Sequence, residues 1–343
     1  MQYPTTLKDS NSLLAKYLTP EIFEKLKDKV TSNGFTLQQA INSGVQNPDS
    51  GIGVYAGDEE SYEIFDLLFD PIIQEYHGFN KNDKHKSNLD ISQLNISNPD
   101  PKNEYILSTR IRVGRNVKDM PLGPAISNTQ RDQIEKDVSD ILSKFDGNLA
   151  GKYFPLNNMS KEDQESLIKD HFLFKEGDRF LDAAGLNADW PNGRGIFHNN
   201  DKTFLVWINE EDQLRIISMQ SGADIKEVFT RLVDAINKIE KQIPFSYNDH
   251  LGFITSCPTN LGTAMRASVH IKLPNLGSNM EQFKEIANKY NVQIRGIHGE
   301  HSNSEGGIYD ISNKRRLGVT EVQCVQDMYD GIVALIKAEK ELE

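Results

Sequence analysis

The sequence is short of cysteine, of long apolar runs and of basic charge, and each shortage excludes a class of protein. Its two cysteines are Cys257 and Cys324, so no disulfide framework supports the fold. No stretch approaches the ~20 consecutive apolar residues of a membrane-spanning helix. Residues 1–6 also lack the basic start and the apolar run of a signal peptide. We therefore expect a cytoplasmic protein without a membrane partner.

Basic side chains are outnumbered, with 38 Lys and Arg against 50 Asp and Glu and a formal net charge of -12. Nonspecific nucleic-acid binding depends on Lys and Arg that neutralise phosphates, so we expect no nucleic-acid partner. The arginines nevertheless occur in tight clusters, which favours a small anionic ligand. The length of 343 residues and the hydrophobic fraction of 37% are typical of a globular chain with two domains.

The chain divides into a helical first part and a mixed second part. Residues 82–104 are rich in Asn, Asp, Ser, Lys and Pro and lack periodicity, which is typical of a linker. We expect a helical N-terminal domain over residues 1–97 and an α+β domain over residues 98–343. Within the first domain, capping residues or capping-box spacing predict helix starts at Thr19, Thr36 and Asp58.

The second part alternates helices with strands. Polar capping residues predict helix starts at Ser127, Asp224, Ser278 and Thr320. Apolar runs predict strands over residues 203–208, 214–219, 251–255, 267–272 and 292–295. Residues 209–213 join the first two of these strands and are too few for a helical crossover. We therefore expect that pair, and the sheet as a whole, to be antiparallel.

Residues 108–115 have the alternation of a strand that carries several arginines. Arg110 and Arg112 are expected on one face, with Ile111 and Val113 on the other. A bulge at the glycine of position 114 is expected to re-aim Arg115. Two adjacent guanidinium groups repel each other unless an anion lies between them, and arginine suits phosphate oxygens. The alternative is a solvated strand face with acidic neighbours.

Two turns carry further candidate residues. The carboxylates of Glu210, Glu211 and Asp212 follow a strand, and they form either a solvated hairpin tip or a site that orients a cationic substrate. Cys257 comes directly before a proline and a threonine. It is either a small buried apolar residue or a thiol whose thiolate is stabilised by a hydroxyl or by turn amides. Residue types alone leave both pairs of alternatives open.

Residues 295–307 combine charged side chains with four glycines, which is typical of either a mobile lid or an ordinary surface loop. His298 and His301 have i, i+3 spacing but no nearby cysteine or third ligand, so we expect no zinc site. The chain also lacks a P-loop and the lysine and H-R-D motifs of protein kinases. If ATP binds, arginines must hold its phosphates.

Together these blocks resemble the phosphagen (guanidino) kinase family. Residues 257–263, with the sequence CPTNLGT, are similar to that family's signature. Further blocks resemble those of the family, namely STRIR at 108–112, NEED at 209–212, RASVH at 266–270 and EGGIYD at 305–310. The resemblance extends from about Leu13 to the C-terminus. Within the family, SGIGVY at 50–55 and DEESY at 58–62 look most like the arginine kinases.

The resemblance implies a small helical domain followed by a larger domain with an antiparallel sheet flanked by helices. It implies reversible transfer of the γ-phosphoryl group of MgATP to the guanidino group of L-arginine, giving phosphoarginine and ADP. Mg²⁺ is expected to bind the phosphates and water, with no metal ligand from the protein. We expect a monomer, with a homodimer as the alternative.

The resemblance also implies three sets of site residues. The catalytic set is Glu211, Cys257, Arg266 and Glu300. The substrate-binding set comprises Ser50, Gly51, Ile52, Gly53, Val54 and Tyr55, together with Glu211, Cys257 and Glu300. The nucleotide-binding set is Ser108, Thr109, Arg110, Ile111, Arg112, His171, Arg215, Arg266, Ala267, Ser268, Val269, His270, Arg295, Gly296, Ile297, His298, Gly299 and Glu300.

The chemistry of a guanidino substrate agrees with these sets. A guanidinium has a pKa above 12, so two carboxylates and a thiolate can hold the cation in line for transfer. We expect the 50–55 loop on the smaller domain and Glu211 and Cys257 on the larger one, so that the domains close around the substrates. Gln213 and His298 stand where arginine kinases commonly have a histidine and an arginine. The alternatives are a kinase of taurocyamine, glycocyamine or creatine, and a non-catalytic anion-binding protein.

Overall fold

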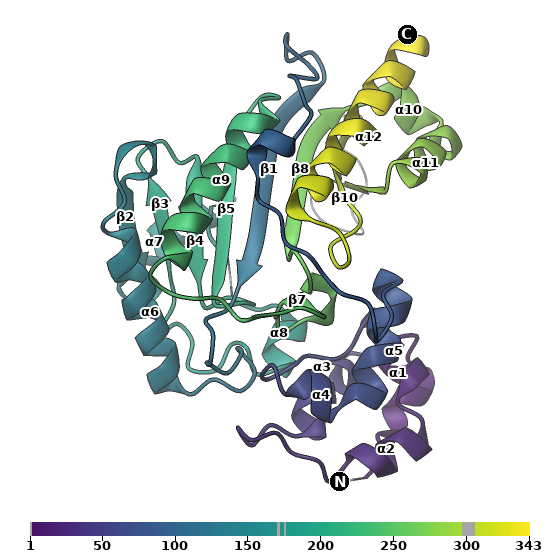
Figure 1. Cartoon of the computed structure of the whole chain (residues 1–343), viewed down its shortest axis with the longest axis vertical. Helices are drawn as coiled ribbons and strands as arrows, with labels where there is room; N and C mark the ends of the chain where they lie inside the picture. Colours follow the sequence, from purple (N-terminus) through teal and green to yellow (C-terminus); the bar gives the residue numbers. More distant parts are fainter. Residues whose placement is uncertain (1, 170–171, 175, 297–305) are drawn as a thin grey trace.

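The computed structural model describes residues 2–169, 172–174, 176–296 and 306–343. A small group of helices forms one end of the molecule, and a large sheet with its own helices forms the rest (Figure 1). The fold is therefore α+β, with a helical domain followed by an antiparallel sheet domain, as predicted.

The helical domain begins with a 3-10 helix at Thr5–Asp9. Its α-helices are α1 (Leu13–Tyr17), α2 (Pro20–Leu26), α3 (Leu37–Gln46), α4 (Ser61–Ile64) and α5 (Asp66–His77). Thr19 caps α2, and Thr36 forms a capping box with Gln39 at the start of α3, so both predicted helix starts are confirmed. The helix predicted after Asp58 is interrupted at Phe65, which separates α4 from α5.

The sheet contains eight strands within the described residues, and every pairing in it is antiparallel. In spatial order the strands are β2 (Gly151–Pro155), β3 (Gly195–Asn199), β4 (Phe204–Ile208), β5 (Leu214–Ser221), β1 (Ile106–Arg115), β8 (Met265–Lys272), β10 (Ile308–Asn313) and β9 (Val292–Gly296). The expected antiparallel pairing of β4 with β5 is confirmed. A separate two-stranded ribbon pairs β6 (Tyr247–Asn248) with β7 (Gly252–Phe253).

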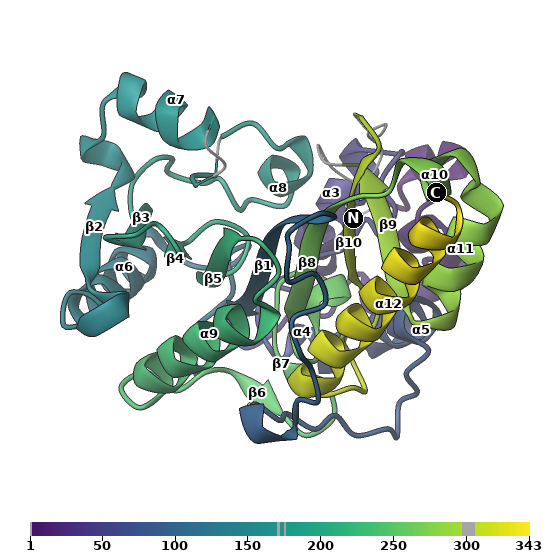
Figure 2. The same ribbon diagram turned by 90° about the horizontal axis from the view of Figure 1, so that it is seen from above.

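Helices cover one face of the sheet, and this face holds the main core. The covering helices are α6 (Asn128–Leu142), α9 (Ile225–Glu240), α10 (Pro274–Ser278), α11 (Met280–Lys289) and α12 (Glu321–Glu341). Figure 2 shows α9 and α12 on this side, with α7 (Lys161–Lys169) and α8 (Arg179–Ala183) on the other. Short 3-10 helices lie at Ile91–Gln93, Gly147–Leu149, Leu156–Asn158 and Pro258–Asn260. Among the described helices, none combines the length and the hydropathy needed to cross a membrane.

The core of the helical domain is completed by residues from far along the chain. Leu122, Leu251, Ile254, Leu261 and Leu317 are buried together with apolar side chains of the helical domain. Later segments of the chain therefore contribute to the core of the helical domain. The domain boundary near residue 97 stays a prediction.

The linker predicted over residues 82–104 runs over the larger domain and bonds to it. The backbone N–H of His85 donates to Asp249 O at 2.8 Å, and that of Asn88 donates to Glu321 Oε2 at 2.7 Å. Leu94 is buried in the main core. The segment is held by contacts with residues that are distant in the sequence and not by a regular helix or strand of its own. It therefore shows no helical or strand periodicity.

Three expectations about local structure are wrong. β1 and β5 pair in continuous register through Gly114, so no bulge forms there, and Arg115 lies buried on the same face as Ile111. A side chain at position 114 would meet Asp212 Oδ2 at 2.9 Å, which explains the glycine. Helix α11 is capped by Asn279 rather than by Ser278, which ends α10.

The third concerns the strand expected over residues 251–255. Only Gly252 and Phe253 of this range belong to a strand, the two-residue β7. Leu251 and Ile254 on either side pack into the core of the helical domain instead. Their apolar character therefore reflects a second core and not a longer strand.

Candidate active site

A row of arginines crosses the sheet face opposite the main core. Arg110 and Arg112 lie on this face of β1, whereas Ile111 and Val113 are fully buried on the other, as predicted. The register places Arg266 of β8 directly opposite Arg112. Three arginines from two neighbouring strands therefore share one face.

Arg110 and Arg112 lie close to further positive charges. Burial and Arg215 lower the pKa of Arg112 well below its ordinary value, and burial and Arg215 lower that of Arg110 to about 10. Within the described residues, Arg112 has no carboxylate in an ion pair. The Arg110 and Arg215 guanidinium groups lie 5.7 and 5.5 Å from the ring of Trp207, which provides weak compensation. An anion would relieve this repulsion.

Asp310 of β10 provides one negative charge beside the row. Its Oδ1 lies 2.5 Å from Arg266 Nη2, and its Oδ2 lies 3.4 Å from His270 Nε2. The register places Asp310 between His270 of β8 and Arg295 of β9. Burial opposes ionisation, but the contacts with His270 and Arg266 hold the pKa of Asp310 below its ordinary value.

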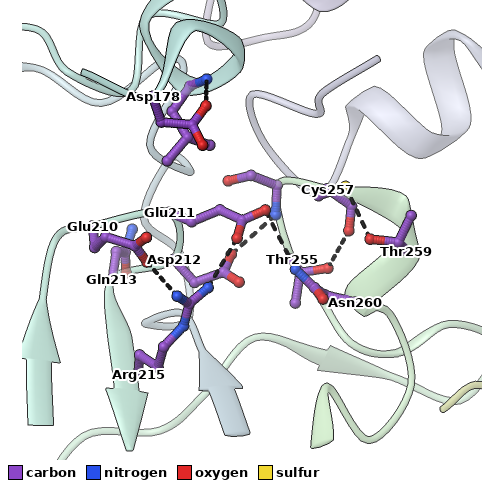
Figure 3. Close-up of polar contacts among 12 residues, drawn as sticks. Asp178, Glu210, Glu211, Asp212, Gln213, Arg215, Thr255, Cys257, Thr259 and Asn260 are labelled. Atoms are coloured by element: carbon purple, nitrogen blue, oxygen red, sulfur yellow. Dashed lines mark hydrogen bonds and ion pairs between the residues drawn. The ribbon is translucent and has the colours of Figure 1, made fainter. Parts of the chain in front are cut away.

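Arg215 of β5 connects the arginine row to the carboxylate turn that precedes it. Its Nη1 lies 2.9 Å from Glu210 Oε2, and its Nη2 donates to Glu211 Oε2 at 2.9 Å (Figure 3). All three side chains are largely buried, so these ion pairs are stronger than exposed ones.

The turn between β4 and β5 is buried and not a solvated tip. Asp212 Oδ1 accepts hydrogen bonds from Asn116 Nδ2 at 2.8 Å and from the Ser256 backbone N–H at 3.1 Å. The Gln213 side chain accepts from the Val117 N–H at 2.7 Å and donates to the Pro121 carbonyl at 2.8 Å. These bonds fix the position of Glu211, which lies between them.

The charge state of Glu211 is sensitive to what binds nearby. Burial raises the pKa of this carboxyl to about 7, although Arg215 acts in the opposite direction and Asp212 adds to the rise. A cationic group placed beside Glu211 would lower this pKa and stabilise the carboxylate.

Cys257 lies at the start of the Pro258–Asn260 turn. Its Sγ is 3.1 Å from the hydroxyl oxygen of Thr259, the kind of contact that the sequence predicts. Asn260 Nδ2 donates to Glu211 Oε1 at 3.4 Å, so the two turns meet (Figure 3). Burial and the Glu211 carboxylate raise the pKa of the thiol, and the contact with Thr259 acts in the opposite direction.

One cavity of about 710 Å³ joins these turns to the predicted substrate loop. Its predicted residues are Ser50, Gly51, Ile52, Gly53, Tyr55, Glu211, Cys257 and Arg295. It is also lined by Thr259, whose hydroxyl contact with the thiol the sequence suggested, and by residues outside the predicted sets, namely Leu13, Glu75, Tyr76, Phe180, Asn260 and Arg316. Arg316 is the last of three consecutive basic residues in an acidic chain. This local charge is the one sequence feature that could have indicated a role for Arg316 in the cavity.

The loop at 50–55 presents backbone donors. The carbonyls of Gly51, Ile52 and Gly53 accept hydrogen bonds from the N–H groups of Leu13, Leu14 and Gly44, at 2.9, 2.9 and 3.1 Å. Among the described residues, none accepts a hydrogen bond from the amides of residues 51–54. The loop is therefore anchored through its carbonyls, which leaves its amides for a carboxylate.

The other residues of the predicted sets fall into three groups. Ile111, Ala267, Val269 and Val54 are buried in the cores, and Thr109 bonds to the Gly222 carbonyl, so their side chains do not join the arginine row. Ser108 lies on the Arg110 face of β1, Ser268 donates to the Arg110 carbonyl at 3.4 Å, and Gly296 pairs with Tyr309. His171, Ile297, His298, Gly299 and Glu300 lie outside the described residues.

Comparison with known proteins agrees with this arrangement. Residues 8–74 match the family domain described as "ATP:guanido phosphotransferase, N-terminal domain", and residues 133–342 match the corresponding C-terminal catalytic domain. The chain belongs to the ATP:guanido phosphotransferase family. It is 59% identical over 336 residues to "Arginine kinase Lit v 2" of Penaeus vannamei, covering 97% of this chain and 94% of that one. Arginine kinase of Callinectes sapidus is 57% identical over 337 residues, with 98% and 94% covered.

Solved structures of other members have the same fold. The duplicated taurocyamine kinase of Schistosoma mansoni, with bound transition-state analogue components, superposes with a TM-score of 0.92 at 43% identity. The match covers 99% of this phosphotransferase and 49% of that chain, so this chain spans about half its length. Lombricine kinase has a TM-score of 0.92 at 38% identity, with 99% and 95% covered.

Proposed function

We propose that this phosphotransferase is an arginine kinase, which reversibly transfers the γ-phosphoryl group of MgATP to L-arginine and yields phosphoarginine and ADP. The observation that carries the proposal is the single cavity that Glu211 and Cys257 line together with Gly51, Ile52 and Gly53. Such a cavity offers groups for a cation and for a carboxylate. The identity to crustacean arginine kinases supports the same substrate.

The guanidinium end of the substrate is proposed to bind Glu211 and Cys257, with Glu300 as a third partner. A guanidinium beside them favours the carboxylate and the thiolate and so lowers both pKa values. The carboxylates hold the nucleophilic nitrogen in line and accept its proton as the new N–P bond forms. Orientation of this kind accounts for much of the rate in phosphoryl transfer.

The other end of L-arginine is proposed to bind the 50–55 loop. The amides of residues 51–54 donate to the α-carboxylate, and the Tyr55 hydroxyl lies in the same cavity. A substrate with a different length between guanidinium and carboxylate cannot engage both ends at once.

The nucleotide phosphates are proposed to occupy the arginine row, because Arg110 and Arg112 lie among other arginines and neither has a carboxylate in an ion pair within the described residues. Arg266 is assigned to stabilise charge on the transferring phosphoryl group. The proposed nucleotide contacts are Ser108–Arg112, His171, Arg215, Arg266–His270 and Arg295–Glu300. Within the described residues, no group of three His, Cys, Asp or Glu side chains could hold a metal ion. Mg²⁺ carried by the phosphates would supply additional positive charge there.

A coupled assay of ADP formation tests the substrate. L-Arginine should give the highest kcat/KM in a panel with taurocyamine, glycocyamine, lombricine and creatine. A preference for another member of this panel would replace L-arginine as the substrate, and the absence of ADP with every compound would favour an anion-binding protein. Cytoplasmic location and a monomeric state are part of the same proposal, and light scattering checks the latter.

A further inference from the structure

The segment that carries the Cys257 thiol is held by the helical domain. The carbonyl of Thr255 accepts a hydrogen bond from the Tyr62 hydroxyl at 2.7 Å. The carbonyl of Ser256 accepts from the Ala56 backbone N–H at 2.7 Å. That of Pro258 lies 2.8 Å from His77 Nε2.

The bond from His77 has a defined direction. A carbonyl oxygen can only accept, so Nε2 must carry the proton and donate it. Burial and the neighbouring Arg316 lower the pKa of His77 to about 4, so the ring is neutral at pH 7. His77 is the last residue of α5, and the two residues before it line the substrate cavity.

The remaining carbonyl of the segment is bonded within the turn. Cys257 O accepts from Thr255 Oγ1 at 2.8 Å and from the Asn260 N–H at 3.0 Å. Leu251, Ile254 and Leu261 on either side belong to the core of the helical domain. The Cys257 turn is therefore hydrogen-bonded to the domain that carries the 50–55 loop, and its flanking residues pack in the core of that domain. From the sequence alone, Cys257 is expected on the larger domain instead.

We propose that Tyr62 and His77 are positioning residues for Cys257. By holding the carbonyls of Thr255 and Pro258, they fix the thiol relative to the loop at 50–55 before any substrate binds. The spacing between the two ends of the substrate is then set within one rigid unit. The inference rests on the proposed function, in which both ends of L-arginine are bound in this cavity.

Substitution of His77 tests the proposal first. His77→Leu removes the donor and should lower kcat about fivefold, the scale of one lost hydrogen bond, with the KM for ATP unchanged. His77→Gln retains an N–H donor and should recover at least half of the activity. Tyr62→Phe should act in the same direction. The matched control is His250→Leu, because His250 Nδ1 lies 2.7 Å from the Asp83 carbonyl, away from the cavity.

A double-mutant cycle separates positioning from general damage. In a Cys257→Ser background, His77→Leu should lower kcat by less than twofold, because the group that it positions is gone. If the fivefold loss persists in that background, His77 does not act through the thiol and the proposal is overturned.

Alkylation by iodoacetamide gives a readout that needs no catalysis. Burial of the Cys257 thiol raises its pKa, so a loosened turn should admit water and speed alkylation of Cys257 about threefold at pH 8. Cys324 is fully buried and serves as the internal control in the same peptide map. Unchanged or slower alkylation of Cys257 in folded His77→Leu and Tyr62→Phe would overturn the proposal. Since this result is independent of the substrate, it is distinguishable from a failure of L-arginine in the activity panel.

Discussion

The arginine row and the substrate cavity are built in opposite ways. The row comes from neighbouring strands in regular register, where Arg112 and Arg266 are direct partners. The cavity comes from segments that are far apart in the chain and are joined by single hydrogen bonds, such as that between His77 and Pro258. A phosphate site needs several positive charges held close together. A site that selects a substrate by its length needs a fixed distance between the groups that bind the two ends of that substrate. Each architecture suits its task.

Loss of Arg266 should have the largest effect, because it removes the arginine that lies directly opposite Arg112. We expect Arg266→Ala to lower kcat at least about 10²-fold, the scale of a lost electrostatic stabiliser, and to leave the KM for L-arginine nearly unchanged. Arg315→Ala is the control, since Arg315 pairs with Asp327 on the surface. Steady-state kinetics on both variants measures this, and near-normal turnover of Arg266→Ala would remove it from the catalytic set.

Substitution of the thiol should cost less, because Cys257 orients the guanidinium without forming a bond to phosphorus. Cys257→Ser is expected to lower kcat by about 10- to 100-fold and to leave activity measurable. Mass spectrometry of the enzyme trapped during turnover should find no phosphorylated Cys257. A phosphocysteine or ping-pong kinetics would contradict direct transfer.

The pH profile should separate the free cavity from the occupied one. In the free enzyme Glu211 has a pKa of about 7 because of burial. Its reactive carboxylate is lost as pH falls, so kcat/KM for L-arginine should drop about tenfold per unit below pH 7. The bound guanidinium lowers this pKa, so kcat should fall only at lower pH. Superimposable profiles of kcat and kcat/KM would be inconsistent with this assignment.

A change behind the substrate loop should have the smallest effect and act on the cavity alone. A side chain at Gly44 would lie 2.6 Å from Gly53 Cα, so Gly44→Ala must push the loop outward. We expect the KM for L-arginine to rise about fivefold, with the KM for ATP unchanged. Equal changes in both constants would mean that the displacement spreads beyond the loop.

Sequence predicted the parts of the molecule that follow local rules. The alternation around Arg110 and Arg112 gave the correct face, and the capping box at Thr36 gave a correct helix start. Contacts such as those of Tyr62 and His77 join residues more than 180 positions apart, and no local pattern signals them. The error at Gly114 has the same origin, because a distant carboxylate explains that glycine.

The position of β1 has a consequence for the order in which the protein is completed during synthesis. β1 is the first strand of the sheet in the chain, yet it lies between β5 and β8 in space. Its arginines leave the ribosome about a hundred residues before β5 and about 150 before β8, with both of its edges still open. Strand edges of this kind are prone to wrong pairing. A growing chain is therefore most exposed to misassembly before β8 arrives, and the phosphate-binding row is completed only with that strand.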